Sequence, residues 1–207
     1  MKTPAFRNFA TLSILLLVGG GCATSGGPHP SMAAQDGAPD LKPQQMVVLA
    51  ADNTPVPWES LVENAGAADM VVLAEQHDDL LAHRFQAAMT GALAARGKIA
   101  VCMEMFERDE QALVDAYMAG AIAQKTLVDI TDSKDWGASG QWDAFYQPIV
   151  DAAKAGKSPV IAANAPRRFT RLGRLESFEV LSTFASAYPE QFVVPEPIEQ
   201  TAYFERF

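Results

Sequence analysis

The chain has 207 residues, of which 49% are hydrophobic and 20% are charged, and its formal net charge is −9. This length and composition fit one globular domain that can bury a core. The negative charge excludes a nucleic-acid-binding protein, because contacts to phosphates need a clustered basic surface.

The first 21 residues have the layout of a secretory signal peptide. Lys2 and Arg7 precede an apolar stretch over residues 12–18, which is too short to span a bilayer. Cys22 follows three glycines, as at the end of a bacterial lipobox, although Gly19 stands where that motif usually has Leu. We expect lipidation of Cys22, with ordinary signal cleavage or a retained anchor as the alternatives. Removal of residues 1–21 takes away two positive charges and changes the net charge from −9 to −11.

A flexible tether is expected over residues 22–44, which are rich in Gly, Pro, Ser, Ala and Gln. One folded domain is expected over residues 45–207. Its first half begins with a strand over 46–50, a short helix over 58–65 and a strand over 70–75. A long helix over 79–96 follows, and Gly97 ends it.

The second half continues with a strand over 98–104 and a helix over 109–118 that Gly120 ends. An irregular stretch over 121–140 should hold a short helix and a loop around Trp136. Pro148 fits the first turn of the next helix, which places Tyr146 near the entrance of that helix. A strand over 158–164 and one amphipathic helix complete the chain.

Short, β-branched apolar runs separated by helical patterns predict an α/β fold. We expect a mostly parallel sheet flanked by helices, built from βα units, with strands buried on both faces. Three of these runs end in groups that can do chemistry: Glu75 with His77, Glu104, and Asn164. Because ligands bind at the carboxyl ends of such strands, these side chains can converge on one site. The alternative is that strand ends simply carry polar residues.

Glu75 and His77 lie two residues apart, so both side chains point to one face if the strand persists. A carboxylate beside an imidazole can hold a metal, orient a base or form an ion pair. His83 lies roughly 240° around a helix from His77, so we do not expect the two histidines to form a paired metal site.

Glu104 ends an apolar run, and a buried carboxylate needs a compensating partner. Arg108 and Arg167 are the candidates, and a structural ion pair and a ligand contact both remain open. Cys102 lies within the same run and is expected to be a buried small hydrophobe without a disulfide partner.

No nucleophile elbow, P-loop, dinucleotide glycine fingerprint or H-E-x-x-H helix is present. Aromatic and Met side chains instead gather near the same strand ends. Such side chains suit a flat apolar ligand, whose anionic groups Arg167 and Arg168 can meet. Ordinary core packing is the alternative for the same set: Met105, Phe106, Trp136, Trp142, Phe145 and Tyr146.

Four motifs together resemble the ChaN-like haem-binding lipoproteins of the Tiki superfamily. The resemblance is carried by residues 74–78 (Ala-Glu-Gln-His-Asp), residues 104–111, the set Tyr117, Gly120, Trp136, Tyr146 and Pro148, and residues 164–167. It is strong over residues 71–168 and looser over the last helix.

The resemblance implies a haem-binding protein of the bacterial envelope that takes part in haem and iron uptake. It implies a lipid anchor, in or near the outer membrane, and pairs of haems held between two subunits. A tyrosine would bind the iron, with Tyr146 as the first candidate and Tyr117 as the alternative. Glu75, His77, Glu104, Trp142, Asn164 and Arg167 would complete the haem site.

The chain departs from the family pattern at two points. Ala74 stands where the first motif usually has Gly, which adds a methyl group where a ligand or a strand can approach closely. The family also continues beyond the position of Phe207, so we expect the sheet to be incomplete and the chain to be a truncated copy. A metal-dependent hydrolase using Glu75 and His77 is the alternative function, and its later histidine is missing here. A non-functional remnant is the third possibility.

Overall fold

The computed structural model describes residues 45–136, 140–189 and 193. These residues form a mixed α/β fold with a parallel strand pair, which confirms the predicted fold class. The predicted signal peptide, Cys22 and the tether lie outside the described residues, as does the chain from residue 194 onward. No helix within the described ranges is long and apolar enough to cross a membrane.

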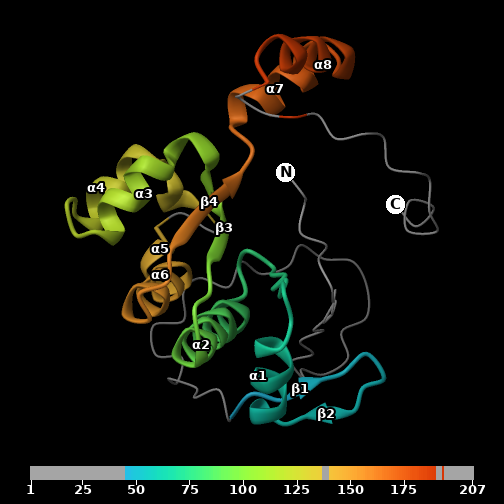
Figure 1. Cartoon of the computed structure of the whole chain (residues 1–207), viewed down its shortest axis with the longest axis vertical. Helices are drawn as coiled ribbons and strands as arrows, with labels where there is room; N and C mark the ends of the chain where they lie inside the picture. The colour runs from blue at the N-terminus through green and yellow to red at the C-terminus, as the bar shows by residue number, and fades with distance from the viewer. Residues whose placement is uncertain (1–44, 137–139, 190–192, 194–207) are drawn as a thin grey trace, which may run out of the picture.

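The first part of the fold is a hairpin packed against two helices (Figure 1). β1 (Val48–Leu49) pairs antiparallel with β2 (Pro55–Val56), and α1 (Trp58–Gly66) and α2 (Leu80–Arg96) follow. The expected strand over 46–50 is thus shortened to two residues and pairs within a hairpin rather than in the parallel sheet. The helix after it and the long helix are confirmed. The Asp79 side chain caps α2 by accepting hydrogen bonds from the backbone N–H groups of Leu81 (2.9 Å) and Ala82 (3.3 Å).

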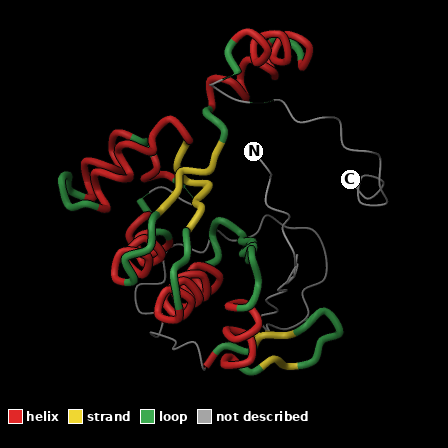
Figure 2. Tube along the Cα trace, viewed as in Figure 1, coloured by secondary structure: helices red, strands yellow, loops and turns green. Residues whose placement is uncertain are grey.

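The second part is built around β3 (Val101–Glu107) and β4 (Val160–Asn164), which pair in parallel. The helical elements between them in the chain lie to one side of this strand pair in Figure 2, and the α-helices among them share one buried core with it. In chain order these are η2 (Arg108–Glu110), α3 (Gln111–Met118), α4 (Gln124–Ile130), η3 (Ser133–Asp135), α5 (Trp142–Phe145) and α6 (Gln147–Ala155). Tyr146 separates α5 from α6 and Pro148 lies in the first turn of α6, as predicted.

Gln111 shows why α3 lies against β4. Its amide nitrogen donates to the carbonyl oxygen of Val160 (2.9 Å), and its amide oxygen accepts from the backbone N–H of Ala162 (2.7 Å). The side chain therefore satisfies two backbone groups of β4, as a neighbouring strand would. No local sequence pattern indicates such a contact.

The chain ends its described part with two helices rather than the single predicted one. α7 (Arg167–Leu175) and α8 (Phe178–Ala187) pack on each other through Phe169 and Ala185 and form a small unit at one end of the molecule (Figure 1). Ser177 is fully extended, and its hydroxyl accepts from the backbone N–H of Val180 (3.2 Å). This serine is the N-cap of α8 and causes the break.

The expected strand over 70–75 is wrong: these residues have no strand partner among those described. Their burial nevertheless alternates, since Leu73 packs against the core around α1 and α2 whereas Val72 is 63% exposed. The prediction that the strands are buried on both faces is also wrong. Glu104 and Ile161 lie on an exposed face of the β3–β4 pair, and Cys102 on that face is exposed rather than buried. The described helices cover only the opposite face.

Candidate functional site

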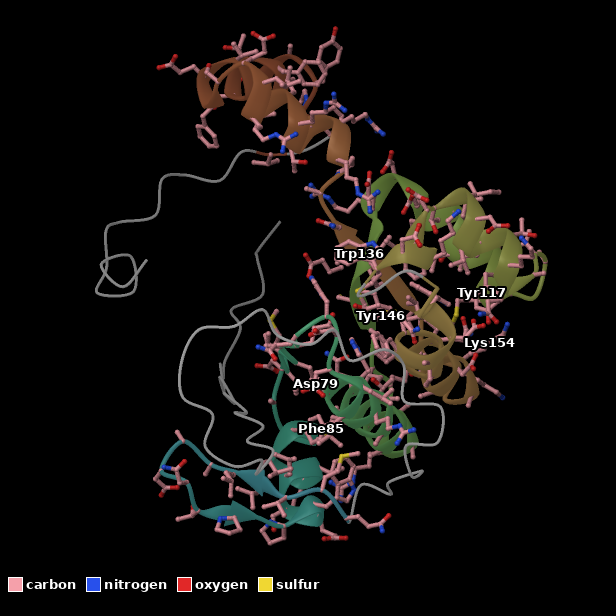
Figure 3. The ribbon with its side chains drawn as sticks, turned by 180° about the vertical axis from the view of Figure 1, so that it is seen from behind. Asp79, Phe85, Tyr117, Trp136, Tyr146 and Lys154 are labelled. Atoms are coloured by element: carbon pink, nitrogen blue, oxygen red, sulfur yellow. The ribbon has the colours of Figure 1, made fainter. Side chains whose placement is uncertain are left out.

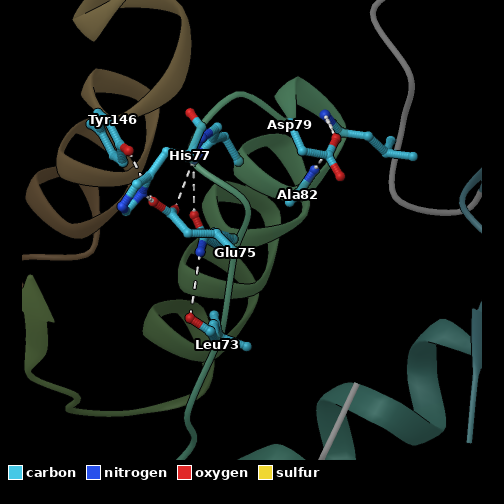
Figure 4. Close-up of polar contacts among 9 residues, drawn as sticks. Leu73, Glu75, His77, Asp79, Ala82 and Tyr146 are labelled. Atoms are coloured by element: carbon cyan, nitrogen blue, oxygen red, sulfur yellow. Dashed lines mark hydrogen bonds and ion pairs between the residues drawn. The ribbon is translucent and has the colours of Figure 1, made fainter. Parts of the chain in front are cut away.

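Glu75 is the centre of a polar cluster in the loop that precedes α2 (Figure 4). Its Oε1 accepts a hydrogen bond from the Tyr146 hydroxyl (2.9 Å) and lies 2.8 Å from Nδ1 of His77. Its Oε2 lies 3.1 Å from Nδ1 of His83. Burial alone would raise the pKa of this carboxyl, but the hydrogen bonds from the two histidines and Tyr146 outweigh it and lower the pKa to about 2. Glu75 is therefore an anion held by three donors.

His83 lies on α2 and is fully buried beneath this cluster. Its Nδ1 faces Oε2 of Glu75 and the side-chain oxygen of Gln86 (3.2 Å), and its Nε2 faces the carbonyl oxygen of His77 (3.2 Å). Every one of these partners is an acceptor, so the protonated ring satisfies them best. Burial lowers the pKa of His83, and the contacts with Glu75, the His77 carbonyl and Gln86 together more than reverse that effect, so the net change is upward. Glu75 and His83 form a buried ion pair.

The sequence pattern did not indicate the part that His83 takes in this cluster. The predicted angle between His77 and His83 treats both as positions on one helix, whereas His77 lies in the loop before the helix begins. The loop folds back so that both histidines reach Glu75. The missed signal was the combination of a histidine near the start of α2 with a carboxylate in the preceding apolar run.

Tyr146 and Tyr117 both lie in the core. Tyr146 is 0% exposed and Tyr117 is 8% exposed. The Tyr146 hydroxyl donates to Glu75, and burial together with that carboxylate raises its pKa above the usual value. Tyr117 accepts a hydrogen bond from Gln147 (2.8 Å), which itself accepts one from the Trp142 indole (2.8 Å). Neither tyrosine reaches the surface as it stands.

Most of the aromatic side chains near the strand ends are core residues rather than a ligand-facing wall. Trp142 is 3% exposed, and its ring packs 5.5 Å from that of Tyr146. Buried with it are Met105, Phe106 and Phe145. The Phe145 ring stacks on His83 at 4.6 Å and closes the cluster from below. These residues support the site without facing solvent.

Three side chains form a row at the surface, and Trp136, which is labelled in Figure 3, lies in its middle. The His77 side chain is 51% exposed, and its ring meets the Trp136 ring edge-on at 5.4 Å. The Arg167 guanidinium lies 6.0 Å from the Trp136 ring and is 55% exposed. The Trp136 indole nitrogen is buried and has no hydrogen-bond partner among the residues that the structure describes. We call this row the His77–Trp136–Arg167 surface.

The expected pairing of Glu104 with Arg108 or Arg167 is wrong. Glu107 contacts Arg167 instead. Its carboxylate lies 3.2 Å from Nε of Arg167 and accepts a hydrogen bond from the backbone N–H of Arg167 (2.9 Å). A register shift between Met103 and Glu107 lengthens β3, so Glu107 lies opposite Asn164 at the end of the sheet. Glu104 is left on the exposed face, where its charge contributes to the raised pKa of Tyr146.

Among the described residues, Glu75, Glu104 and Asn164 form no hydrogen bond or ion pair with one another, and other side chains near these segment ends meet instead. The loop end carrying Glu75 and His77 meets Trp136, which in turn lies beside Arg167 just after β4. The second predicted cation, Arg168, forms an ion pair with Asp109. Within the described ranges, no group of three or more His, Cys, Asp or Glu side chains has an arrangement suited to a metal ion.

A comparison with protein-family models matches residues 61–207 to the family described as haem-binding uptake, Tiki superfamily, ChaN. The chain belongs to this family. No curated protein and no solved structure matches it. Membership confirms the resemblance and supports a haem-related cofactor-binding function.

The His77–Trp136–Arg167 surface fits the chemistry of haem. Haem is a flat apolar ring with an iron at its centre and two carboxylates at one edge. The surface offers an imidazole for the iron, an indole for the ring and a half-exposed guanidinium for a carboxylate. The unpartnered indole N–H of Trp136 is a further donor that an anionic group can satisfy.

Proposed function

We propose that the chain binds haem on the His77–Trp136–Arg167 surface and serves haem and iron uptake in the bacterial envelope. The observation that carries this proposal is the exposed imidazole of His77, held by Glu75 beside an aromatic ring and a cation. Family membership supports the same cofactor.

The other predicted haem contacts remain part of the proposal. Glu75 orients His77, and Trp142 supports Tyr146 from within the core. Glu104 lies on the exposed sheet face and Asn164 at the end of β4. The resemblance implies a tyrosine as the iron ligand, Tyr146 or alternatively Tyr117, and either hydroxyl would have to leave its present hydrogen bond before it could bind iron.

Titration of the purified chain with ferric haem tests the proposed cofactor. We expect a saturable shift of the Soret band, and an unchanged spectrum at stoichiometric haem would contradict the proposal. Arg167→Ala should weaken binding of haem but not of haem dimethyl ester, because only haem carries free carboxylates. Arg171→Ala is the matched control, since Arg171 is also an exposed arginine of α7.

The envelope location is proposed from the amino-terminal sequence. A signal peptide over residues 1–21 and lipidation of Cys22 would anchor the protein, through the tether, to a membrane, in or near the outer membrane. Metabolic labelling with a radioactive fatty acid should mark the wild-type chain and not Cys22→Ser. Labelling of both would place the lipid elsewhere, and labelling of neither would indicate an unlipidated protein.

The proposal also includes a homodimer that encloses haem between two subunits. Sedimentation of the chain with and without haem measures this association directly. A mass that doubles only when haem is added is the expected result, and a monomer at saturating haem would contradict it.

A further inference from the structure

We propose that His77, through its Nε2 atom, is the iron ligand of the haem that this chain binds. This inference rests on the proposed function and departs from the tyrosine ligation that the resemblance implies. It follows from the tautomer, the exposure and the anchoring of His77.

The contact with Glu75 sets the tautomer of His77. A carboxylate is an acceptor, so the ring nitrogen 2.8 Å from Oε1 of Glu75 carries the proton. In the neutral ring the free lone pair is then on Nε2, which is the atom that can bind iron. A carboxylate behind a histidine also fixes the ring orientation and makes the ligating nitrogen more basic.

His77 is also the accessible candidate. Its side chain is 51% exposed, and its Nε2 has no hydrogen-bond partner within the described part of the chain. His83 and Tyr146, by contrast, are both 0% exposed and both engaged with Glu75. As the side chains lie, an iron at the centre of a wide planar ring can approach His77 directly, whereas His83 and Tyr146 would first have to be uncovered.

The backbone around His77 is held in place from below. Nε2 of the buried His83 lies 3.2 Å from the carbonyl oxygen of His77, and the same imidazole pairs with Glu75. The buried imidazole of His83 therefore holds both the backbone of His77 and the Glu75 carboxylate that orients the His77 side chain. Such support from residues that do not touch the ligand is typical of built metal-ligand sites.

Charge favours histidine over tyrosine at this place. Deprotonation of Tyr146 would break its hydrogen bond to Glu75 (2.9 Å) and set a second negative charge against that buried carboxylate until the phenolate moved away to an iron. Histidine binds iron as a neutral ring and leaves Glu75 as the only anion of the cluster. The same carboxylate that disfavours the phenolate strengthens the imidazole.

The test combines haem titration with resonance Raman spectra of the reduced, haem-loaded protein. We expect an iron–histidine stretching mode that shifts when the chain is labelled with ¹⁵N-histidine. His77→Ala should lose this mode and weaken haem affinity at least about tenfold, and Glu75→Gln should weaken it about 10–100-fold. His29→Ala is the matched control, because His29 belongs to the expected tether.

The outcomes separate this inference from the proposed function. No saturable binding by the wild-type chain would overturn haem binding itself. Binding with loss of the histidine mode in His77→Ala, and its retention in His29→Ala and Tyr146→Phe, supports His77 as the ligand. Binding with a tyrosinate-to-iron charge-transfer band that Tyr146→Phe or Tyr117→Phe abolishes would overturn the inference and leave haem binding intact. Loss of the mode in His29→Ala would show an adventitious histidine contact and also overturn it.

Discussion

Replacement of Glu75 by Gln tests whether the buried ion pair stabilises the fold. The structure lowers the pKa of this carboxyl from 4.5 to about 2, and at about 1.36 kcal/mol per pKa unit this corresponds to about 3 kcal/mol. A carboxylate with a lowered pKa contributes stability above its unfolded value near 4.5 and loses that contribution as the pH falls toward 2. Gln resembles the protonated acid, so Glu75→Gln should lose about 3 kcal/mol at neutral pH.

Urea unfolding followed by tryptophan fluorescence at a series of pH values measures this effect. The wild-type chain should lose stability as the pH falls from 4.5 toward 2, and Glu75→Gln should lack that part of the slope. Glu63→Gln is the matched control, because Glu63 is an exposed carboxylate on α1 and its loss should change stability by less than about 0.5 kcal/mol. Wild-type stability of Glu75→Gln at pH 7, or an unchanged acid slope, would refute the reasoning.

Three further predictions concern the ionisation of His83, the packing of Gly156 and the capping of α2. His83 has a raised pKa, so its contribution to the free energy of unfolding is complete below the unfolded pKa of 6.5 and is lost as the pH rises through the folded pKa. His83→Gln should therefore remove this loss of stability with rising pH in the same unfolding experiment. Gly156→Ala would bring a Cβ to 2.4 Å from the Cβ of Ala94 and should lower stability by about 1–3 kcal/mol in thermal unfolding. Gly97→Ala meets no atom within 4 Å and should be neutral, so equal losses in the two glycine variants would contradict the close α2–α6 contact. Asp79→Ala removes the N-cap of α2 and should cost about 1 kcal/mol by urea midpoint, whereas no loss would show that the cap is dispensable.

Local signals in the sequence predicted the helices well. The long helix begins after Asp79 and ends before Gly97, where a cap and a helix-ending glycine were expected. Pro148 lies in the first turn of α6 and places Tyr146 at its entrance. These signals act within one or two turns of the chain, so they do not depend on the rest of the fold.

Pairing between distant segments could not be predicted in the same way. The polar end of β3 was assigned to Glu104, but the register shift in the sheet moves it to Glu107, where Arg167 meets it. The apolar run before Glu75 was assigned to a strand, yet it has no partner strand in the described structure. Apolar content indicates that a segment is partly buried, whereas strand assignment also needs a hydrogen-bonding neighbour.

The sequence by itself determined the α/β class, the extent of the main helices and the family to which the chain belongs. Only the tertiary structure decided that Glu75 pairs with the buried His83, that Tyr146 points inward and that His77 faces solvent. The physical reason is that Glu75 and Tyr146 are 71 residues apart, so their hydrogen bond forms only when α2 and α6 pack together. Hydrophobic periodicity and capping motifs depend on residues close together in the sequence. The partners of a buried charge, by contrast, are set by the packing of segments that are distant in the sequence.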